Sequence, residues 1–132
     1  MDLLLYKVGR NLNRIYRTAE AFEIKKLRLY ECKESYLNGN LYRAKNRVEI
    51  EIITNWPENL LALETYYPDP ISKIDWKNIQ VIAIGGETYG LPKNIPANQK
   101  ATIPMQGQIS GLTIEATIAI VLYEWRRRYE YI

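Results

Sequence analysis

The chain has 132 residues, of which 47% are hydrophobic and 25% charged, and this is the composition of a folded globular protein. No apolar run reaches membrane-spanning length and the N-terminus lacks a cleavage signal, so we expect one cytoplasmic domain over residues 1–132. The sequence contains no histidine and a single cysteine, Cys32. An internal disulfide, a usual zinc or haem site and any mechanism with a histidine base are therefore not expected.

Basic residues are concentrated in the first part of the chain. Residues 1–50 contain 11 Lys and Arg against 6 Asp and Glu, whereas residues 51–132 contain 7 against 9. The segment 6–17, "YKVGRNLNRIYR", has four basic residues and no acidic one. A solvated helix face and a phosphate-binding surface explain this segment equally well. For the second explanation, the candidate contacts are Arg10, Arg14 and Arg17.

The first half of the chain predicts a β-α-β unit followed by a third strand. Apolar and β-branched residues predict strands over residues 3–8, 26–32 and 48–54. Apolar residues at helical spacing predict a helix over residues 13–22, with Asn11 or Asn13 as its cap.

The second half continues the alternation of helices and strands. Asn55 and Pro57 predict the start of a helix that continues through the leucines of residues 60–64. A buried strand follows at residues 79–86, then a short strand at 101–104 and a long helix over 112–129. This order predicts an α/β fold with a parallel sheet and helices on both faces.

The last helix is apolar nearly all round. One stripe consists of Leu112, Ala116, Ala119, Ile120 and Tyr123, and the other of Ile114, Ile118, Val121, Leu122 and Trp125. A surface helix needs only one apolar stripe. We therefore expect the second stripe to contact another copy of the chain in a homodimer.

The turn "GGETYG", residues 85–90, does not match the common nucleotide-binding motifs. Its glycines do not follow the G-x-G-x-x-G spacing of dinucleotide-binding folds, and Leu91 stands where a P-loop requires lysine. Two glycines after a strand indicate only a tight turn when taken alone. Here the turn is followed by "GLP", by "IPM" and by the long helix.

Together these features resemble the three ordered motifs of the SpoU/TrmH-type RNA methyltransferases of the SPOUT superfamily. The first motif, Asn-x-Gly-x-x-x-Arg with Thr-Ala after it, is matched by residues 11–19, with Asn13 in place of glycine. The second, Gly-x-Glu-x-x-Gly-Leu-Pro, is matched in full by residues 85–92. The third is matched over residues 103–124, with Gly111 in place of serine and Thr113 in place of asparagine. The resemblance spans residues 3–128.

The resemblance implies a dimer, a C-terminal trefoil knot and S-adenosylmethionine as cofactor, bent among three loops. Only the resemblance predicts the knot, because chains rarely thread through their own loops. Carried over by motif, the cofactor contacts are Ile84, Gly85, Gly86, Ile103, Met105 and Leu112, with Thr54 at the end of the third strand as a weaker candidate. We expect the two glycines to let the backbone approach the ligand.

The reaction that the resemblance implies is methylation of a ribose 2′-hydroxyl in tRNA or rRNA, with base methylation left open. The motif match makes Arg17 the central catalytic residue. A guanidinium stays protonated, so we assign Arg17 to orienting phosphate and stabilising a developing alkoxide. Glu87 is assigned to hold Arg17 or the motif loops, and Asn11 to fix the first loop. Thr113 completes the catalytic set, with Ser110 placed to compensate for the serine missing at Gly111.

Two alternatives remain open. A dimeric RNA-binding member of the family that holds the cofactor weakly would fit the substitutions at Gly111 and Thr113, because both lose polar groups. An α/β protein that binds a small molecule and no RNA would fit the composition, but not the basic first segment. No metal and no membrane is expected as a partner.

Overall fold

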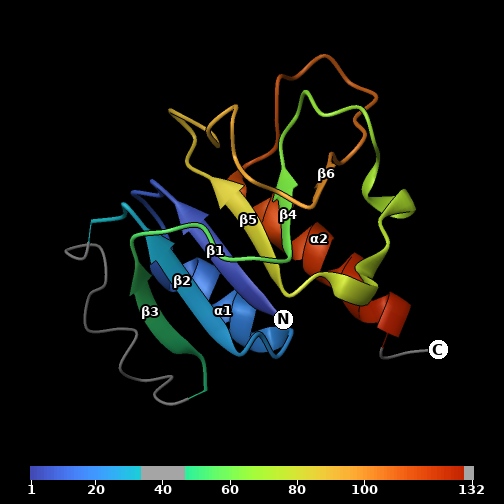
Figure 1. The fold of residues 1–132 in the computed structure, drawn as a ribbon. Coiled ribbons are helices and arrows are strands. Elements are labelled where there is room, and N and C mark those ends of the chain that lie inside the picture. The colour runs from blue at the N-terminus through green and yellow to red at the C-terminus, as the bar shows by residue number, and fades with distance from the viewer. Residues whose placement is uncertain (34–46, 130–132) are drawn as a thin grey trace.

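The computed structural model describes residues 1–33 and 47–129, in which six parallel strands form one sheet in the order β3-β2-β1-β5-β4-β6 (Figure 1). The predicted parallel α/β fold is confirmed. The elements in chain order are β1 (Asp2–Tyr6), α1 (Leu12–Ala21), β2 (Lys26–Tyr30), β3 (Glu49–Ile53), β4 (Leu60–Leu63), the 3-10 turns η3 (Ile71–Lys73) and η4 (Trp76–Asn78), β5 (Val81–Gly85), β6 (Gln99–Ala101) and α2 (Ile114–Tyr129).

Each face of the sheet packs against its own apolar cluster. On β1, Leu3 and Leu5 pack with the residues of α1 and α2, whereas Leu4 packs on the opposite face. This alternation follows from the two-residue period of a strand. The opposite face is covered by Leu91 and Ile95 from the segment after β5. Both faces of the central strands are therefore dry.

Both described α-helices cover the same face of the sheet, together with η3 and η4 (Figure 1). They run in the same direction, because Arg14 of α1 pairs with Glu115 of α2 at 3.7 Å while Arg126 donates a hydrogen bond to the Phe22 carbonyl at 2.8 Å. The expectation of helices on both faces is thus not met in the described residues, where irregular segments cover the second face.

The strand β4 corrects the helix predicted after Pro57. Its four residues are all buried, and it pairs with β5 on one side and β6 on the other. Leu and Ala favour helices, and a short apolar run does not distinguish a buried strand from a helix. Asn59, with a φ of 58°, turns the chain into the strand, and its carbonyl accepts the Gln80 N–H at 2.9 Å. Long-range pairing therefore decides the conformation.

The helix α2 uses only one of its two apolar stripes within the chain. Ile118, Val121 and Leu122 are fully buried against the sheet. On the other stripe, Ile120 is 40% exposed and Tyr123 is 57% exposed. Leu112, which was predicted to lie in this helix, precedes its first residue and is 40% exposed. Within the described part of the chain, no helix has the length and apolar character needed to span a membrane.

A buried tyrosine joins α1 to the start of β3. The Tyr16 hydroxyl donates to the Val48 carbonyl at 3.0 Å and accepts from the Val48 N–H at 3.2 Å. Both residues are buried, so water cannot replace these bonds. This pair fixes the entry of the chain into β3.

We predict that Tyr16→Phe lowers the free energy of unfolding by about 1–3 kcal/mol, because it leaves the buried Val48 groups without a partner. Urea denaturation followed by circular dichroism measures this change. Tyr67→Phe is the matched control, since the buried Tyr67 hydroxyl holds no backbone group within the described residues. Equal stability of Tyr16→Phe and the wild type would contradict the prediction.

Candidate active site

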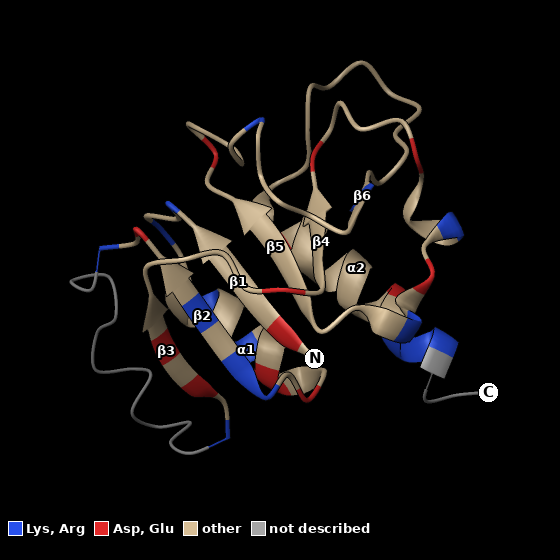
Figure 2. Cartoon of the chain, in the orientation of Figure 1, with Lys and Arg blue, Asp and Glu red and all other residues tan. Residues whose placement is uncertain are grey.

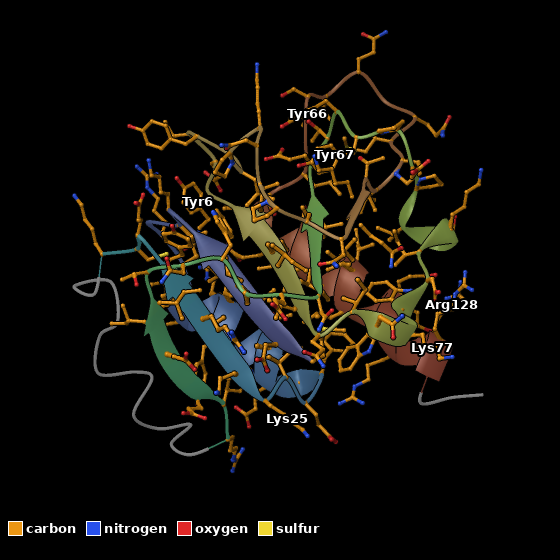
Figure 3. All side chains as sticks on the ribbon, viewed as in Figure 1. Tyr6, Lys25, Tyr66, Tyr67, Lys77 and Arg128 are labelled. Carbon is orange, nitrogen blue, oxygen red and sulfur yellow. The ribbon has the colours of Figure 1, made fainter. Side chains whose placement is uncertain are left out.

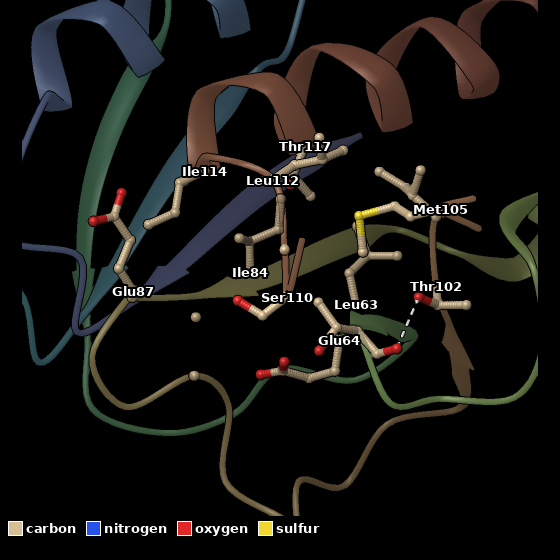
Figure 4. Close-up of a pocket in the computed structure, with 16 residues that line it drawn as sticks. Leu63, Glu64, Ile84, Glu87, Thr102, Met105, Ser110, Leu112, Ile114 and Thr117 are labelled. Carbon is tan, nitrogen blue, oxygen red and sulfur yellow. Dashed lines mark hydrogen bonds between the residues drawn. The ribbon is translucent and has the colours of Figure 1, made fainter. Parts of the chain in front are cut away.

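A cavity of about 340 Å³ lies beyond the carboxyl ends of β4, β5 and β6. This edge of a parallel sheet is where α/β folds bind their ligands. In Figure 4, Glu87 and Ile114 lie toward one end of the cavity, and Thr102 and Met105 toward the other. The lining residues are Leu63, Glu64, Thr65, Ile84, Gly85, Gly86, Glu87, Gly90, Thr102, Ile103, Met105, Ser110, Gly111, Leu112, Ile114 and Thr117.

Six of the seven predicted cofactor contacts line this cavity: Ile84, Gly85, Gly86, Ile103, Met105 and Leu112. Thr54 does not line it. It follows β3, at the edge of the sheet beyond β2 and β1, whereas the cavity lies over β5, β4 and β6. The third wall of the cavity comes instead from Leu63, Glu64 and Thr65 at the end of β4. The prediction missed these residues because it placed a helix there. The sequence pattern that could have identified them is a short apolar run followed by polar residues, which is typical of a buried strand that ends at a site.

The glycines of the turn after β5 allow close approach of the chain to itself. A Cβ atom on Gly86 would overlap the Lys7 carbonyl oxygen, and one on Gly85 would overlap the backbone of Gly90 and Leu91. Within the chain, both glycines close the turn, which the hydrogen bond from the Gly90 N–H to the Gly86 carbonyl at 2.8 Å completes. The expectation that they also let the backbone approach a ligand stays a prediction, because both line the cavity.

Glu64 ties the end of β4 to this turn. Its Oε1 accepts the Leu91 N–H at 2.6 Å, and it lies so close to Gly90 that a Cβ there would come within 2.6 Å of the same oxygen. Gly90 also has a φ of 63°, a conformation that side chains other than Asn and Asp rarely adopt. Glu64 and Gly90 thus hold the turn over the cavity.

A second cavity, also of about 340 Å³, adjoins the first on the side of β1. The two share Glu87 and Ile114. The second is lined by Lys7, Gly9, Arg10, Asn11, Ile15, Glu87, Thr88, Tyr89, Ile114 and Glu115. Among the carboxylates of the described residues, Glu87 alone faces both cavities.

The predicted residues of the first motif are divided between this cavity and the helix surface. Arg10 and Asn11 line the cavity, and Asn11 occupies the cap position of α1 with a φ of 60° but without a side-chain capping bond. Arg14 and Arg17 project from α1, are exposed and line neither cavity. No ion pair joins Glu87 to Arg17 in the described residues, so the expected support of Arg17 by Glu87 is not seen within one chain.

One of the two substituted positions of the third motif, Thr113, has a structural role. The Thr113 hydroxyl accepts the Ala116 N–H at 3.2 Å and so caps α2. Thr113 is exposed and lines neither cavity, whereas Ser110 and Gly111 line the first. A Cβ on Gly111 would lie 3.4 Å from Thr65, an ordinary contact. The chain therefore has room for the family's serine at this position.

The chain belongs to the SpoU rRNA Methylase family, whose model matches residues 3–123. This confirms the resemblance based on the three motifs. Over 76 residues the chain is 34% identical to a tRNA (cytidine(34)-2′-O)-methyltransferase of Yersinia pestis, a match covering 54% of this chain and 47% of that protein. The enzyme of the same name from Escherichia coli K12 is 33% identical over 76 residues and is covered to 48%. The chain thus spans about half the length of these curated relatives.

Solved structures share the fold at low sequence identity. A structure described under 2-OH methylation of C/U34 on tRNA matches with a TM-score of 0.84 at 21% identity, over 99% of this chain and 97% of that one. An rRNA methyltransferase from Sinorhizobium meliloti with bound AdoMet matches with a TM-score of 0.80 at 21% identity, over 97% of this chain and 56% of that one. These matches confirm the predicted fold class.

We predict that Glu64→Ala destabilises the protein by about 1–3 kcal/mol, because the Leu91 N–H loses its acceptor, whereas Glu64→Gln retains most of the stability. Urea denaturation of both variants beside the wild type measures the difference. Equal losses in Glu64→Gln and Glu64→Ala would show that the charge of Glu64, rather than its acceptor oxygen, holds the turn.

Proposed function

We propose that this chain is an S-adenosylmethionine-dependent RNA methyltransferase that methylates a ribose 2′-oxygen of tRNA. The observation that supports this most directly is the cavity at the carboxyl ends of β4, β5 and β6, which the second and third motifs of the family line together. The curated relatives, which are named for 2′-O-methylation of tRNA, support the choice of substrate.

The chemistry of the cavity fits the proposed cofactor. Its volume of about 340 Å³ lies in the range of small-molecule sites. Ile84, Ile103 and Met105 offer apolar surface for an adenine ring. Glu64 and Glu87 offer negative charge for the ammonium and sulfonium groups, and Figure 2 shows acidic positions just beyond the tips of β4 and β5. Bound there, S-adenosylmethionine supplies an activated methyl group.

The residues of the chain then have to position the ribose and ease the loss of its 2′-hydroxyl proton. Glu87 faces both cavities, so its carboxylate is placed to accept a hydrogen bond from a hydroxyl at their boundary. Arg17 is assigned to orient phosphate and to stabilise negative charge on the 2′-oxygen, since a guanidinium remains charged. Asn11 shapes the wall of the second cavity.

A homodimer through α2 is part of the same proposal. The exposed stripe of α2 offers Ile120 and Tyr123 to a second copy, with the exposed Leu112 just before the helix. Leu112 also lines the first cavity, so a partner on this stripe would lie at the mouth of the cavity. Arg17 lies between Arg14 and Phe22, which contact the two ends of α2, and is therefore level with its middle. The dimer contact is what would bring Arg17 to an active site.

The C-terminal trefoil knot and the cytoplasmic location are also retained as proposals. The resemblance supports the knot, and the tRNA-modifying relatives support the location.

The second candidate function is a dimeric RNA-binding protein with weak or no methyl transfer. The structure favours this candidate at one point: the Thr113 hydroxyl is engaged in capping α2 and lies outside the cavity, so it does not replace the amide that the family has there.

Titration calorimetry with S-adenosylmethionine and transfer of radiolabelled methyl groups to unfractionated tRNA and to rRNA test the proposed function. We expect binding, and transfer to tRNA. Binding of RNA without binding of the cofactor would support the second candidate. Binding of the cofactor with transfer only to rRNA would contradict the substrate. Alkaline hydrolysis of the labelled RNA distinguishes ribose from base products: a 2′-O-methyl group blocks cleavage of the adjacent phosphodiester and leaves the label in dinucleotides, whereas a methylated base is released in a mononucleotide.

We predict that Arg17→Lys keeps the cofactor affinity within a few-fold but lowers methyl transfer by roughly 100-fold or more, because it loses the planar donor fork. Arg47→Lys is the control, since Arg47 is exposed and lines neither cavity. Transfer by Arg17→Lys at the wild-type rate would exclude the role assigned to Arg17.

We predict that Ile120→Glu converts the dimer to a monomer in light scattering at micromolar concentration, because it places a charge in the open apolar stripe. Ile118 is unsuitable for this test, since it is fully buried within its own chain. The matched control is Ile52→Glu, on the exposed surface of β3. A wild type that is already monomeric would refute the dimer.

A further inference from the structure

Tyr89 lies exposed at the tip of the turn between the two cavities. It is 72% exposed and lines the second cavity, beside Glu87 and Thr88. The turn that carries it is closed by the hydrogen bond between Gly90 and Gly86. The ring of Tyr89 is apolar surface that remains in contact with water, and the closed turn already holds it in place. A ligand that covers the ring would therefore gain apolar contact with little loss of conformational freedom.

Three other aromatic side chains of the described residues at this edge of the sheet already have partners. Tyr6, Tyr30 and Trp56 form a partly buried cluster with ring centroids 4.7–5.3 Å apart, and Figure 3 labels Tyr6 near the carboxyl end of β1. Among the described residues, Tyr89 contacts no other aromatic ring. No aromatic ring of the described residues therefore stacks on Tyr89, and only the Lys7 ammonium lies over the ring.

Positive charge lies on the same side of this cavity. The Lys7 ammonium is 4.9 Å from the centre of the Tyr89 ring and pairs with Glu31 at 3.6 Å. Tyr6 and Glu31 raise the pKa of Lys7 above its ordinary value. Arg10 lines the cavity and makes no ion pair with the described residues.

We propose that Tyr89 stacks on the base of the nucleotide whose ribose is methylated, while Lys7 and Arg10 bind the phosphates that flank it. This inference rests on the proposed function, because it places the target nucleotide in the cavity next to that of the methyl donor. An aromatic face beside two cations is the arrangement by which proteins hold a single-stranded nucleotide, with the base on the ring and the backbone on the charges. Glu87 and Ile114, shared by both cavities, then lie at the ribose.

The substitutions Tyr89→Ala and Tyr89→Phe test the stacking directly. We expect Tyr89→Ala to lower kcat/KM for unfractionated tRNA by roughly 5- to 100-fold, mainly through KM, which is the usual effect of removing one stacking ring. Tyr89→Phe keeps the ring and is expected to stay within about threefold of the wild type. Both variants should bind S-adenosylmethionine as the wild type does in calorimetry.

Ile52→Ala is the matched control, because Ile52 is an exposed apolar residue on β3 that lines neither cavity. The inference is overturned if Tyr89→Ala retains the wild-type kcat/KM, if Tyr89→Phe loses as much as Tyr89→Ala, or if Tyr89→Ala loses cofactor binding. Dissociation of the Tyr89→Ala dimer in light scattering also overturns it, since Tyr89 would then belong to the subunit contact.

Equilibrium binding of fluorescently labelled tRNA separates this inference from the proposed function. If the wild type binds tRNA without transferring methyl groups, the proposed function fails, and weaker binding by Tyr89→Ala than by Tyr89→Phe still supports stacking. If the wild type binds no tRNA, the stacking role is overturned as well.

Discussion

Both cavities depend on how tightly the turn after β5 packs against the rest of the chain. The backbone of Gly86 lies against Lys7 at the end of β1, and that of Gly85 against Gly90 and Leu91, with no room for a Cβ at either glycine. Because β5 lies between β1 and β4, this turn forms the wall that the two cavities share. A side chain at either glycine would therefore force the walls apart rather than merely occupy a ligand site.

The sequence predicted the strands whose apolar patterns are unambiguous, and the motifs located the main cavity. It did not predict β4, because residues Leu60–Leu63 have helix-forming side chains and become a strand only by pairing with β5 and β6. Thr54 was carried over from the family resemblance at the end of the third predicted strand, and that strand is β3 at the far edge of the sheet. The wall of the site that the prediction lacked is the end of β4.

Residues of similar type have different structural roles in this protein. The position of a residue within a motif does not predict which role it has. Glu64 uses one carboxylate oxygen to hold the Leu91 N–H, whereas Glu87 faces both cavities. Thr113 stands at a motif position but caps a helix, while Ser110 faces the cavity. A motif predicts which segments of the backbone lie next to the site. Which side chain is available for chemistry depends on the hydrogen bonds that the surrounding backbone requires.

The position of β5 also determines when the site comes into existence as the chain folds. Leu3 pairs with Leu27, 24 positions away, but also with Ile82, 79 positions away. The pairings of β1 with β2, of β2 with β3 and of β4 with β5 all close much shorter loops, so each half of the sheet is easier to form than the pairing of β1 with β5 that joins them. Until β5 is added, one edge of β1 lacks its hydrogen-bond partners, and neither cavity has its common wall. During synthesis or refolding, the capacity to bind a ligand is thus acquired only after the two halves of the sheet have joined.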